Sequence, residues 1–129
     1  MENNENPMRG IRGAITVEKD SPEDILSATL LLFETLIEKN RLELNDITAL
    51  FITVTPDLKS VFPAQAIRQI EKYRFLPIMC SQEIAVDGAI ERCIRLMVIA
   101  FCPGIKPHSV HHIYLRKAQN LRPDIVGEN

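Results

Sequence analysis

The segment from Ser21 to Asn40 constrains the fold most, because it is a long amphipathic stretch between segments rich in β-forming residues. Ser21, Pro22 and Asp24 form a helix start: a hydroxyl cap, a proline at the first helical position and a carboxylate near the positive helix end. Six residues follow at helical spacing and form one apolar face: Ile25, Thr29, Leu32, Phe33, Leu36 and Ile37. The sequence therefore predicts the long helix of the domain, ending near Asn40.

The segments around this helix have the composition of β-strands. We predict strands at Met8–Val17, Ile47–Val54, Phe75–Cys80, Ile94–Phe101 and Val110–Leu115. Gly10 and Gly13 in the first strand allow close backbone approach, and Pro77 marks the third as an edge strand or a bulge. Pro63 opens a short second helix. Strands that alternate with helices early in the chain and pair directly with one another later indicate an α/β fold with a mixed sheet, in the order βαβαβββ.

Length and composition favour a globular protein with one domain, predicted over residues 8–129 behind a disordered head of residues 1–7. The net charge is −2 and no run of lysine or arginine occurs, so no nucleic-acid partner is expected. The longest apolar run, Leu96–Cys102, is far shorter than the roughly 20 residues that span a bilayer. We therefore expect no membrane span.

The N-terminal residues and the cysteines indicate a cytoplasmic protein. The chain begins with an acidic, polar stretch that lacks the basic and apolar parts of a secretory signal. Its three cysteines, Cys80, Cys93 and Cys102, have no CxxC spacing, which argues against a disulfide framework and against a zinc site. They are expected to be free thiols in a reducing compartment.

Two arginines interrupt otherwise apolar strand sequence: Arg12 within Ile11–Ile15, and Arg95 within Cys93–Val98. Burying an unpaired arginine is costly, so one interpretation places each side chain on a solvent-facing side of the sheet. The other interpretation is an anion site, because guanidinium groups match carboxylates in a bidentate way. Glu83, just after the third predicted strand, either faces such a cluster or lies solvated. The residues alone leave both interpretations open and name no ligand.

Other reactive side chains give weaker signals. Cys80 is either a hydrogen-bonding thiol or a small core residue. His108, His111 and His112 have HxxHH spacing in a loop-to-strand region with no carboxylate among them, so we expect no metal site. The chain has no glycine-rich phosphate loop, no G-x-S-x-G elbow and no dinucleotide fingerprint.

A series of short motifs, however, occurs in the order found in one enzyme family. They are Arg9–Ala14, Thr55–Leu58, Val61–Ala64, Cys80–Glu83, Cys93–Arg95, Tyr114–Leu115 and Leu121–Asp124. In these residues the chain resembles the monofunctional trimeric chorismate mutases. The resemblance implies a homotrimeric pseudo-α/β barrel with active sites at the subunit interfaces. It also implies conversion of chorismate to prephenate for phenylalanine and tyrosine biosynthesis, with no cofactor, since the rearrangement is concerted and unimolecular.

The resemblance also implies roles for individual residues. Arg95 is the cation beside the ether oxygen, Arg12 grips the carboxylate and ether region, and Glu83 with Cys80 clamps the substrate hydroxyl. The implied catalytic residues are thus Arg95, Glu83 and Arg12. Further substrate-binding positions are Tyr114 near a ligand carboxylate, Phe62 and Ala64 from the adjacent subunit, Arg68 and Arg122 at the periphery, and Leu121.

The chain departs from the family pattern at three places. Gln65 stands where a lysine is common, Met79 stands where a threonine is common, and the segment containing Gly104–Pro107 is one residue longer. These differences affect how fast the ligand is captured and how its hydroxyl group is contacted, but not the reaction itself. Two alternative functions stay open: a trimeric imine or enamine deaminase, which has a similar subunit, and a non-catalytic sensor of an aromatic-pathway metabolite. Arg12, Arg95 and Glu83 together favour the mutase, because a dianionic ether requires more cations than a small imino acid does.

Overall fold

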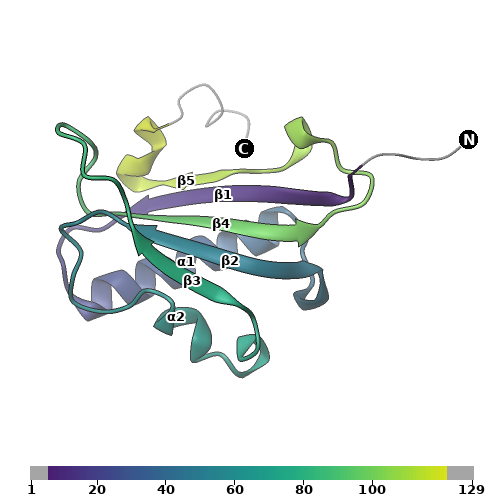
Figure 1. The fold of residues 1–129 in the computed structure, drawn as a ribbon, viewed down its shortest axis with the longest axis horizontal. Helices are drawn as coiled ribbons and strands as arrows, with labels where there is room; N and C mark the ends of the chain where they lie inside the picture. The colour runs from purple at the N-terminus through teal and green to yellow at the C-terminus, as the bar shows by residue number, and fades with distance from the viewer. Residues whose placement is uncertain (1–5, 122–129) are drawn as a thin grey trace, which may run out of the picture.

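A five-stranded mixed sheet with helices on one face forms the framework of the molecule (Figure 1). The computed structural model describes residues 6–121, so residues 1–5 of the predicted head and Arg122 lie outside the described residues. The elements are β1 (Met8–Thr16), α1 (Pro22–Lys39), β2 (Ile47–Val54), α2 (Gln65–Arg68), β3 (Ile78–Gln82), β4 (Cys93–Phe101) and β5 (Ile113–Leu115). A short 3-10 helix, η4 (Arg116–Asn120), follows β5. This order confirms the predicted α/β class.

The strand order in the sheet is β3-β2-β4-β1-β5. β4 pairs antiparallel with both β1 and β2, whereas β3 joins β2 and β5 joins β1 in parallel. The prediction that the later strands pair directly with one another is therefore wrong for β3, β4 and β5. β4 has nine residues and is almost continuously apolar. Such a strand buries most apolar surface when it lies at the centre of the sheet, with a neighbouring strand on each edge. The prediction that β3 is an edge strand is confirmed.

Helix α1 matches its prediction and covers the sheet. Asp24 donates its backbone N–H to the Ser21 hydroxyl over 3.1 Å, so the predicted cap is formed. The helix buries one face against the strands, with the side chains of Ile25, Ala28, Thr29, Leu32, Phe33 and Leu36. Truncating one of the large members to alanine costs about 2–5 kcal/mol, because the surrounding core closes only partly over the cavity.

Gly13 in β1 lies close to α1 and to β5. A Cβ there would lie 3.0 Å from Cδ1 of Leu32 and 3.2 Å from the carbonyl oxygen of Ile113. At Gly10 the nearest atom would be Sδ of Met97 at 3.6 Å, an ordinary contact. The predicted close approach is therefore confirmed at Gly13, but Gly10 is not required for it.

Several predicted boundaries differ from the structure, among them the end of β3, which is Gln82 instead of Cys80. The second helix begins at Gln65 instead of Pro63, and β3 begins at Ile78, after Pro77, instead of at Phe75. Pro77 has no N–H for the ladder, although its carbonyl accepts from Leu50 N at 2.9 Å. β5 starts at Ile113 instead of Val110, because the residues just before it, His111 and His112, form hydrogen bonds that involve side chains instead of backbone pairing with β1.

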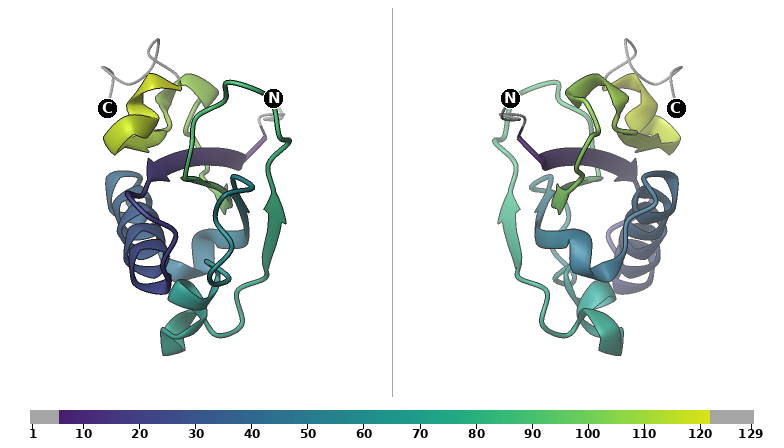
Figure 2. Two further views of the ribbon diagram at one scale, coloured as in Figure 1. Left: turned by 90° about the vertical axis from the view of Figure 1, so that its left-hand side faces the viewer. Right: turned by 90° about the vertical axis from the view of Figure 1, so that its right-hand side faces the viewer.

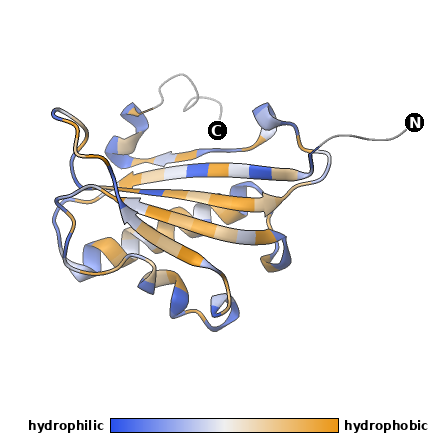
Figure 3. Cartoon of the chain, viewed as in Figure 1, coloured by the Kyte–Doolittle hydropathy of each residue, from blue (hydrophilic) through white to orange (hydrophobic). Residues whose placement is uncertain are grey.

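The two faces of the sheet have different coverings (Figure 2). Helix α1 lies on one side of β1 and η4 on the other, while much of the second face carries no helix. Figure 3 shows hydrophobic residues along β2 and β4 and hydrophilic ones interrupting β1. Phe51, Met79, Met97 and Phe101 lie on this second face and are 42%, 68%, 37% and 46% exposed. Within the described residues, no helix is long and apolar enough to cross a bilayer.

Candidate active site

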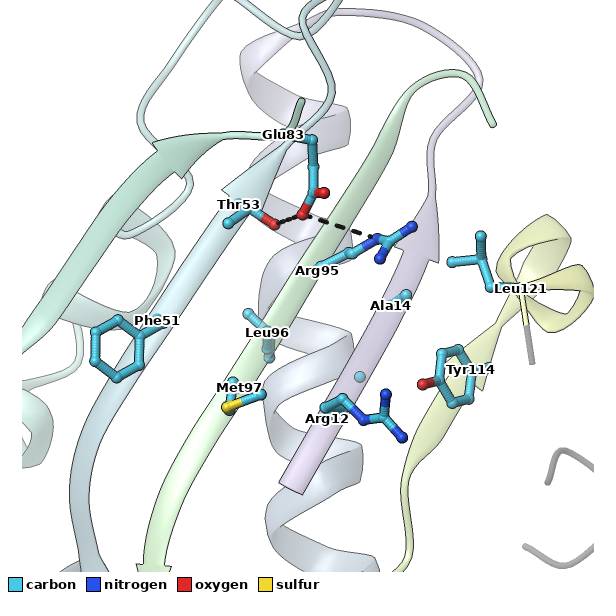
Figure 4. Close-up of a pocket in the computed structure, with 11 residues that line it drawn as sticks. Arg12, Ala14, Phe51, Thr53, Glu83, Arg95, Leu96, Met97, Tyr114 and Leu121 are labelled. Atoms are coloured by element: carbon cyan, nitrogen blue, oxygen red, sulfur yellow. Dashed lines mark hydrogen bonds and ion pairs between the residues drawn. The ribbon is translucent and has the colours of Figure 1, made fainter. Parts of the chain in front are cut away.

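A pocket of about 360 Å³ lies on the sheet face opposite α1 (Figure 4). β1, β2, β4 and β5 contribute to its lining, together with one residue just after β3 and one after η4. The lining residues are Arg12, Gly13, Ala14, Phe51, Thr53, Glu83, Arg95, Leu96, Met97, Tyr114 and Leu121. Five of the sequence-predicted site residues therefore meet in one place.

Strand alternation explains why both arginines point to the same face. Ala14 on β1 is the register partner of Arg95 on β4, and Arg12 is the partner of Met97. Since side chains two residues apart share a face of a strand, Arg12 and Arg95 lie on one side of the sheet. Their apolar neighbours, such as Ile11 and Ile94, are fully buried against α1 on the other.

Glu83 reaches the pocket from the first residue after β3. Its backbone N–H donates to the carbonyl of Val54 at 2.9 Å, which extends the β2–β3 pairing to the site. The side chain turns toward β2, where the Thr53 hydroxyl donates to Oε2 of Glu83. The same oxygen lies 3.9 Å from Nε of Arg95, an ion pair across the sheet face.

Arg95 has a buried nitrogen that lacks a hydrogen-bond acceptor. Among the described residues, its Nε is the buried side-chain atom with no hydrogen-bond partner, although 43% of the whole side chain is exposed. A buried donor left unpaired costs about 1–3 kcal/mol. Below it, burial raises the pKa of the Cys93 thiol to about 11, a rise that the Arg95 charge opposes. The arginine is thus a partly exposed cation between the Cys93 thiol and Glu83.

The other end of the pocket is formed by Arg12 and Tyr114. The backbone N–H of Arg12 donates to Nδ1 of His112 at 3.0 Å. Tyr114 is the register partner of Ala14, and Figure 4 shows its side chain pointing toward Arg12. Two cations, a carboxylate and a phenol therefore border one small cavity, an arrangement suited to a small polycarboxylate with a hydroxyl group.

A second small core holds η4 above the pocket. Ala14, Cys93 and Ala118 are fully or almost fully buried together, and Tyr114 and Leu121 pack against them. Lys117 donates its backbone N–H to the Thr16 hydroxyl at 3.1 Å, and Nη1 of Arg116 donates to the Thr16 carbonyl at 3.1 Å. These contacts fix where Leu121 sits. Arg122, the next residue, lies outside the described residues.

The remaining sequence-predicted residues lie elsewhere in this chain. Phe62, 75% exposed, and Cys80 line a separate cavity of about 560 Å³. Cys80 packs against the helix-side core, so it does not share a cavity with Glu83. Ala64 is fully buried at the start of α2, and Arg68 is exposed on it. One chain thus carries two groups of predicted site residues on different surfaces.

Thr53, Phe51 and Met97 line the main pocket but are absent from the sequence-predicted set. Phe51 and Thr53 lie on one face of the predicted strand Ile47–Val54, so alternation alone groups them. Which strand lies beside them depends on the sheet order, and no local pattern states it. In the part of the chain that the structure describes, no group of three His, Cys, Asp or Glu residues could hold a metal ion.

Comparisons with known proteins identify relatives over nearly the whole chain. Residues 8–125 match the sequence model of the family chorismate mutase type I. Chorismate mutase AroH of Bacillus subtilis is 41% identical over 118 residues, covering 92% of each protein. Chorismate mutase AroH of Thermus thermophilus is 43% identical over 119 residues, covering 92% of this chain and 96% of the relative. A solved chorismate mutase from Clostridium thermocellum superimposes with a TM-score of 0.80 at 37% identity, over 86% of this chain and 97% of that one.

Proposed function

This chain belongs to the type I chorismate mutases, isomerases that convert chorismate to prephenate in aromatic amino acid biosynthesis, and we propose that it works at the pocket between Arg12 and Arg95. The observation that carries the assignment of the site is the ion pair of Arg95 with Glu83 in the lining of this pocket, in which Nε of Arg95 has no hydrogen-bond acceptor. The catalysis proposed is electrostatic and conformational, with no covalent intermediate and no cofactor.

Arg95 acts on the ether oxygen. The rearrangement breaks a carbon–oxygen bond while a carbon–carbon bond forms, so negative charge gathers on that oxygen in the transition state. A cation that is already in place binds this charge more strongly than it binds the substrate, which lowers the barrier. A millionfold acceleration requires about 8 kcal/mol of such differential stabilisation. The Arg95 side chain lines the pocket and is 43% exposed, so its guanidinium group is available for this interaction.

Arg12, Tyr114 and Glu83 hold the substrate in its reactive shape. Arg12 and Tyr114 bind a carboxylate at one end of the pocket, and Glu83 accepts a hydrogen bond from the substrate hydroxyl at the other. Fixing both ends of the flexible ether favours the conformer in which the reacting carbons approach each other. Leu121 borders the site on the C-terminal side, and the resemblance implies that Arg122, outside the described residues, attracts the substrate dianion.

We place the complete site at the interfaces of a homotrimer in the cytoplasm. The neighbouring subunit supplies Phe62, Ala64, Cys80 and Arg68, which lie away from the main pocket in their own chain. Two observations support this assembly. The sheet face around the pocket exposes four large apolar side chains, and such a patch favours association. Phe62 and Cys80 also line a cavity separate from the main pocket.

The first experiment is the loss of chorismate absorbance with purified protein, with prephenate confirmed as the product. Wild-type turnover together with an inactive Arg95→Ala variant supports both the reaction and the central cation. Chorismate binding without turnover would identify a sensor instead, and an active Arg95→Ala variant would remove Arg95 from the mechanism.

Shared sites are tested by mixing two inactive variants. Arg95→Ala and Phe62→Asp damage opposite halves of the proposed site, so hybrid trimers made by co-refolding contain some intact sites. We expect activity to reappear in the mixture and not in either variant alone. Sedimentation of the wild type as a monomer, or no recovery in hybrids, would contradict the interface arrangement.

A further inference from the structure

We propose that Thr53 is a positioning residue for Glu83: its hydroxyl holds one carboxylate oxygen so that the other faces the substrate. The hydroxyl donates to Oε2 of Glu83, which leaves Oε1 as the carboxylate oxygen for which residues 6–121 provide no hydrogen-bond donor. This inference rests on the proposed function, in which Glu83 binds the substrate hydroxyl. It assigns Thr53 no contact with the reacting atoms.

The sheet places Thr53 between the two charged residues. Thr53 on β2 is the register partner of Arg95 on β4 and, on its other side, of Ser81 on β3, two residues before Glu83. Both neighbouring strands are hydrogen-bonded to β2 along this stretch, so the threonine has little freedom to move. A β-branched side chain in a strand also has a restricted χ1 angle. The hydroxyl is therefore a rigid reference point for a longer, more flexible side chain.

The hydroxyl also holds the Glu83 oxygen that lies nearer to Arg95. Oε2 lies 3.9 Å from Nε of Arg95, beyond hydrogen-bond distance, and in the described part of the chain no other side chain donates to Glu83. Without the Thr53 hydroxyl, the carboxylate is free to move closer to Nε of Arg95 and turn the ion pair into a charged hydrogen bond. That contact would partly neutralise the guanidinium group proposed to face the ether oxygen and would turn the carboxylate from the substrate hydroxyl.

The test uses Thr53→Val, which keeps the shape and loses the hydroxyl, and Thr53→Ser, which keeps the hydroxyl. We expect Thr53→Val to lower kcat/KM for chorismate about tenfold or more, because two substrate contacts are displaced, with Thr53→Ser within about threefold of wild type. Valine favours a strand, so the variant should fold. If it does not, Thr53→Ala replaces it, with thermal unfolding and oligomeric state measured for every variant.

A double-mutant cycle separates positioning from a structural role. In a Glu83→Ala background the partner is gone, so Thr53→Val should change kcat/KM by less than about twofold. An equal loss in both backgrounds, a Thr53→Ser variant as impaired as Thr53→Val, or a fully active Thr53→Val would each overturn the inference. A wild type without mutase activity would instead overturn the proposed function and this inference with it, so the two failures are distinguishable.

Discussion

The backbone N–H of Arg12 donates to Nδ1 of His112 over 3.0 Å, one residue before the backbone pairing of β1 with β5 begins at Gly13 and Ile113. A histidine side chain thus takes the place of a strand at the edge of β1. Because an N–H can only donate, Nδ1 must be unprotonated to accept it. The position of a substrate-binding arginine therefore depends on the ring beside it.

His112→Leu should lower kcat/KM for chorismate by about fivefold to tenfold, because the lost acceptor leaves the strand at Arg12 without its hydrogen bond. His112→Asn, whose side-chain oxygen can occupy the place of Nδ1, should retain most of the activity. His108→Leu, at an exposed position, is the matched control. Equal activities of the leucine and asparagine variants at position 112 would refute the role of the acceptor.

Arg95→Ala should reduce turnover at least about a thousandfold, equivalent to about 4 kcal/mol of transition-state stabilisation. Arg95→Lys should also fail, because a flexible ammonium replaces a planar guanidinium with an aligned Nε donor. Turnover is followed by chorismate absorbance, with Arg74→Ala, an exposed arginine paired with Glu71, as the control. Substantial activity in the lysine variant would contradict the geometric part of the mechanism.

Thr16→Val should raise KM for chorismate several-fold with a smaller effect on kcat. The buried Thr16 hydroxyl accepts from the backbone of Lys117, so its loss frees η4 and the placement of Leu121 above the pocket. Steady-state kinetics and limited proteolysis near residue 117 measure both consequences. Thr35→Val is the control, since the Thr35 hydroxyl bonds only within α1. A variant at position 16 with unchanged KM and proteolysis would show that η4 is held by packing.

Stability should decrease as the pH rises from about 9 to about 11, because burial raises the pKa of Cys93 from 9.0 to about 11. The folded state keeps a proton that the unfolded state releases, so the stabilisation is complete below pH 9 and is lost through pH 11. The loss at the upper end is about 2 kcal/mol. Urea unfolding across this range measures it, and Cys93→Ala should flatten the dependence. At pH 8, alkylation of folded protein should spare Cys93.

Gly13→Ala should destabilise the protein by about 1–3 kcal/mol, because a Cβ there meets a backbone carbonyl and Leu32 at close range. Gly10→Ala on the same strand is the matched control and should be nearly neutral, since its Cβ finds ordinary contacts. Urea unfolding of both variants checks the difference. Similar stabilities would mean that α1 shifts to make room.

Part of the site was predictable from residue type and motif order. Arg12, Arg95, Glu83, Tyr114 and Leu121, expected from the resemblance, do line one pocket. The expected clamp of Glu83 with Cys80 does not form within one chain, since the two side chains lie on opposite faces of the sheet region. Alternation along β3 separates them, and a motif written as Cys80–Glu83 does not reveal it.

The sequence by itself determined the elements whose signals are local. α1 lies where its cap and 3.6-residue periodicity predict, and β2 has the predicted bounds, because capping, propensity and periodicity act over a few neighbouring residues. Only the tertiary structure decided that β4 lies between β1 and β2, and thereby that Thr53 lies beside Arg95. Strand order depends on which distant edges together bury the most apolar surface, a comparison between pairings far apart in the chain that no local pattern contains.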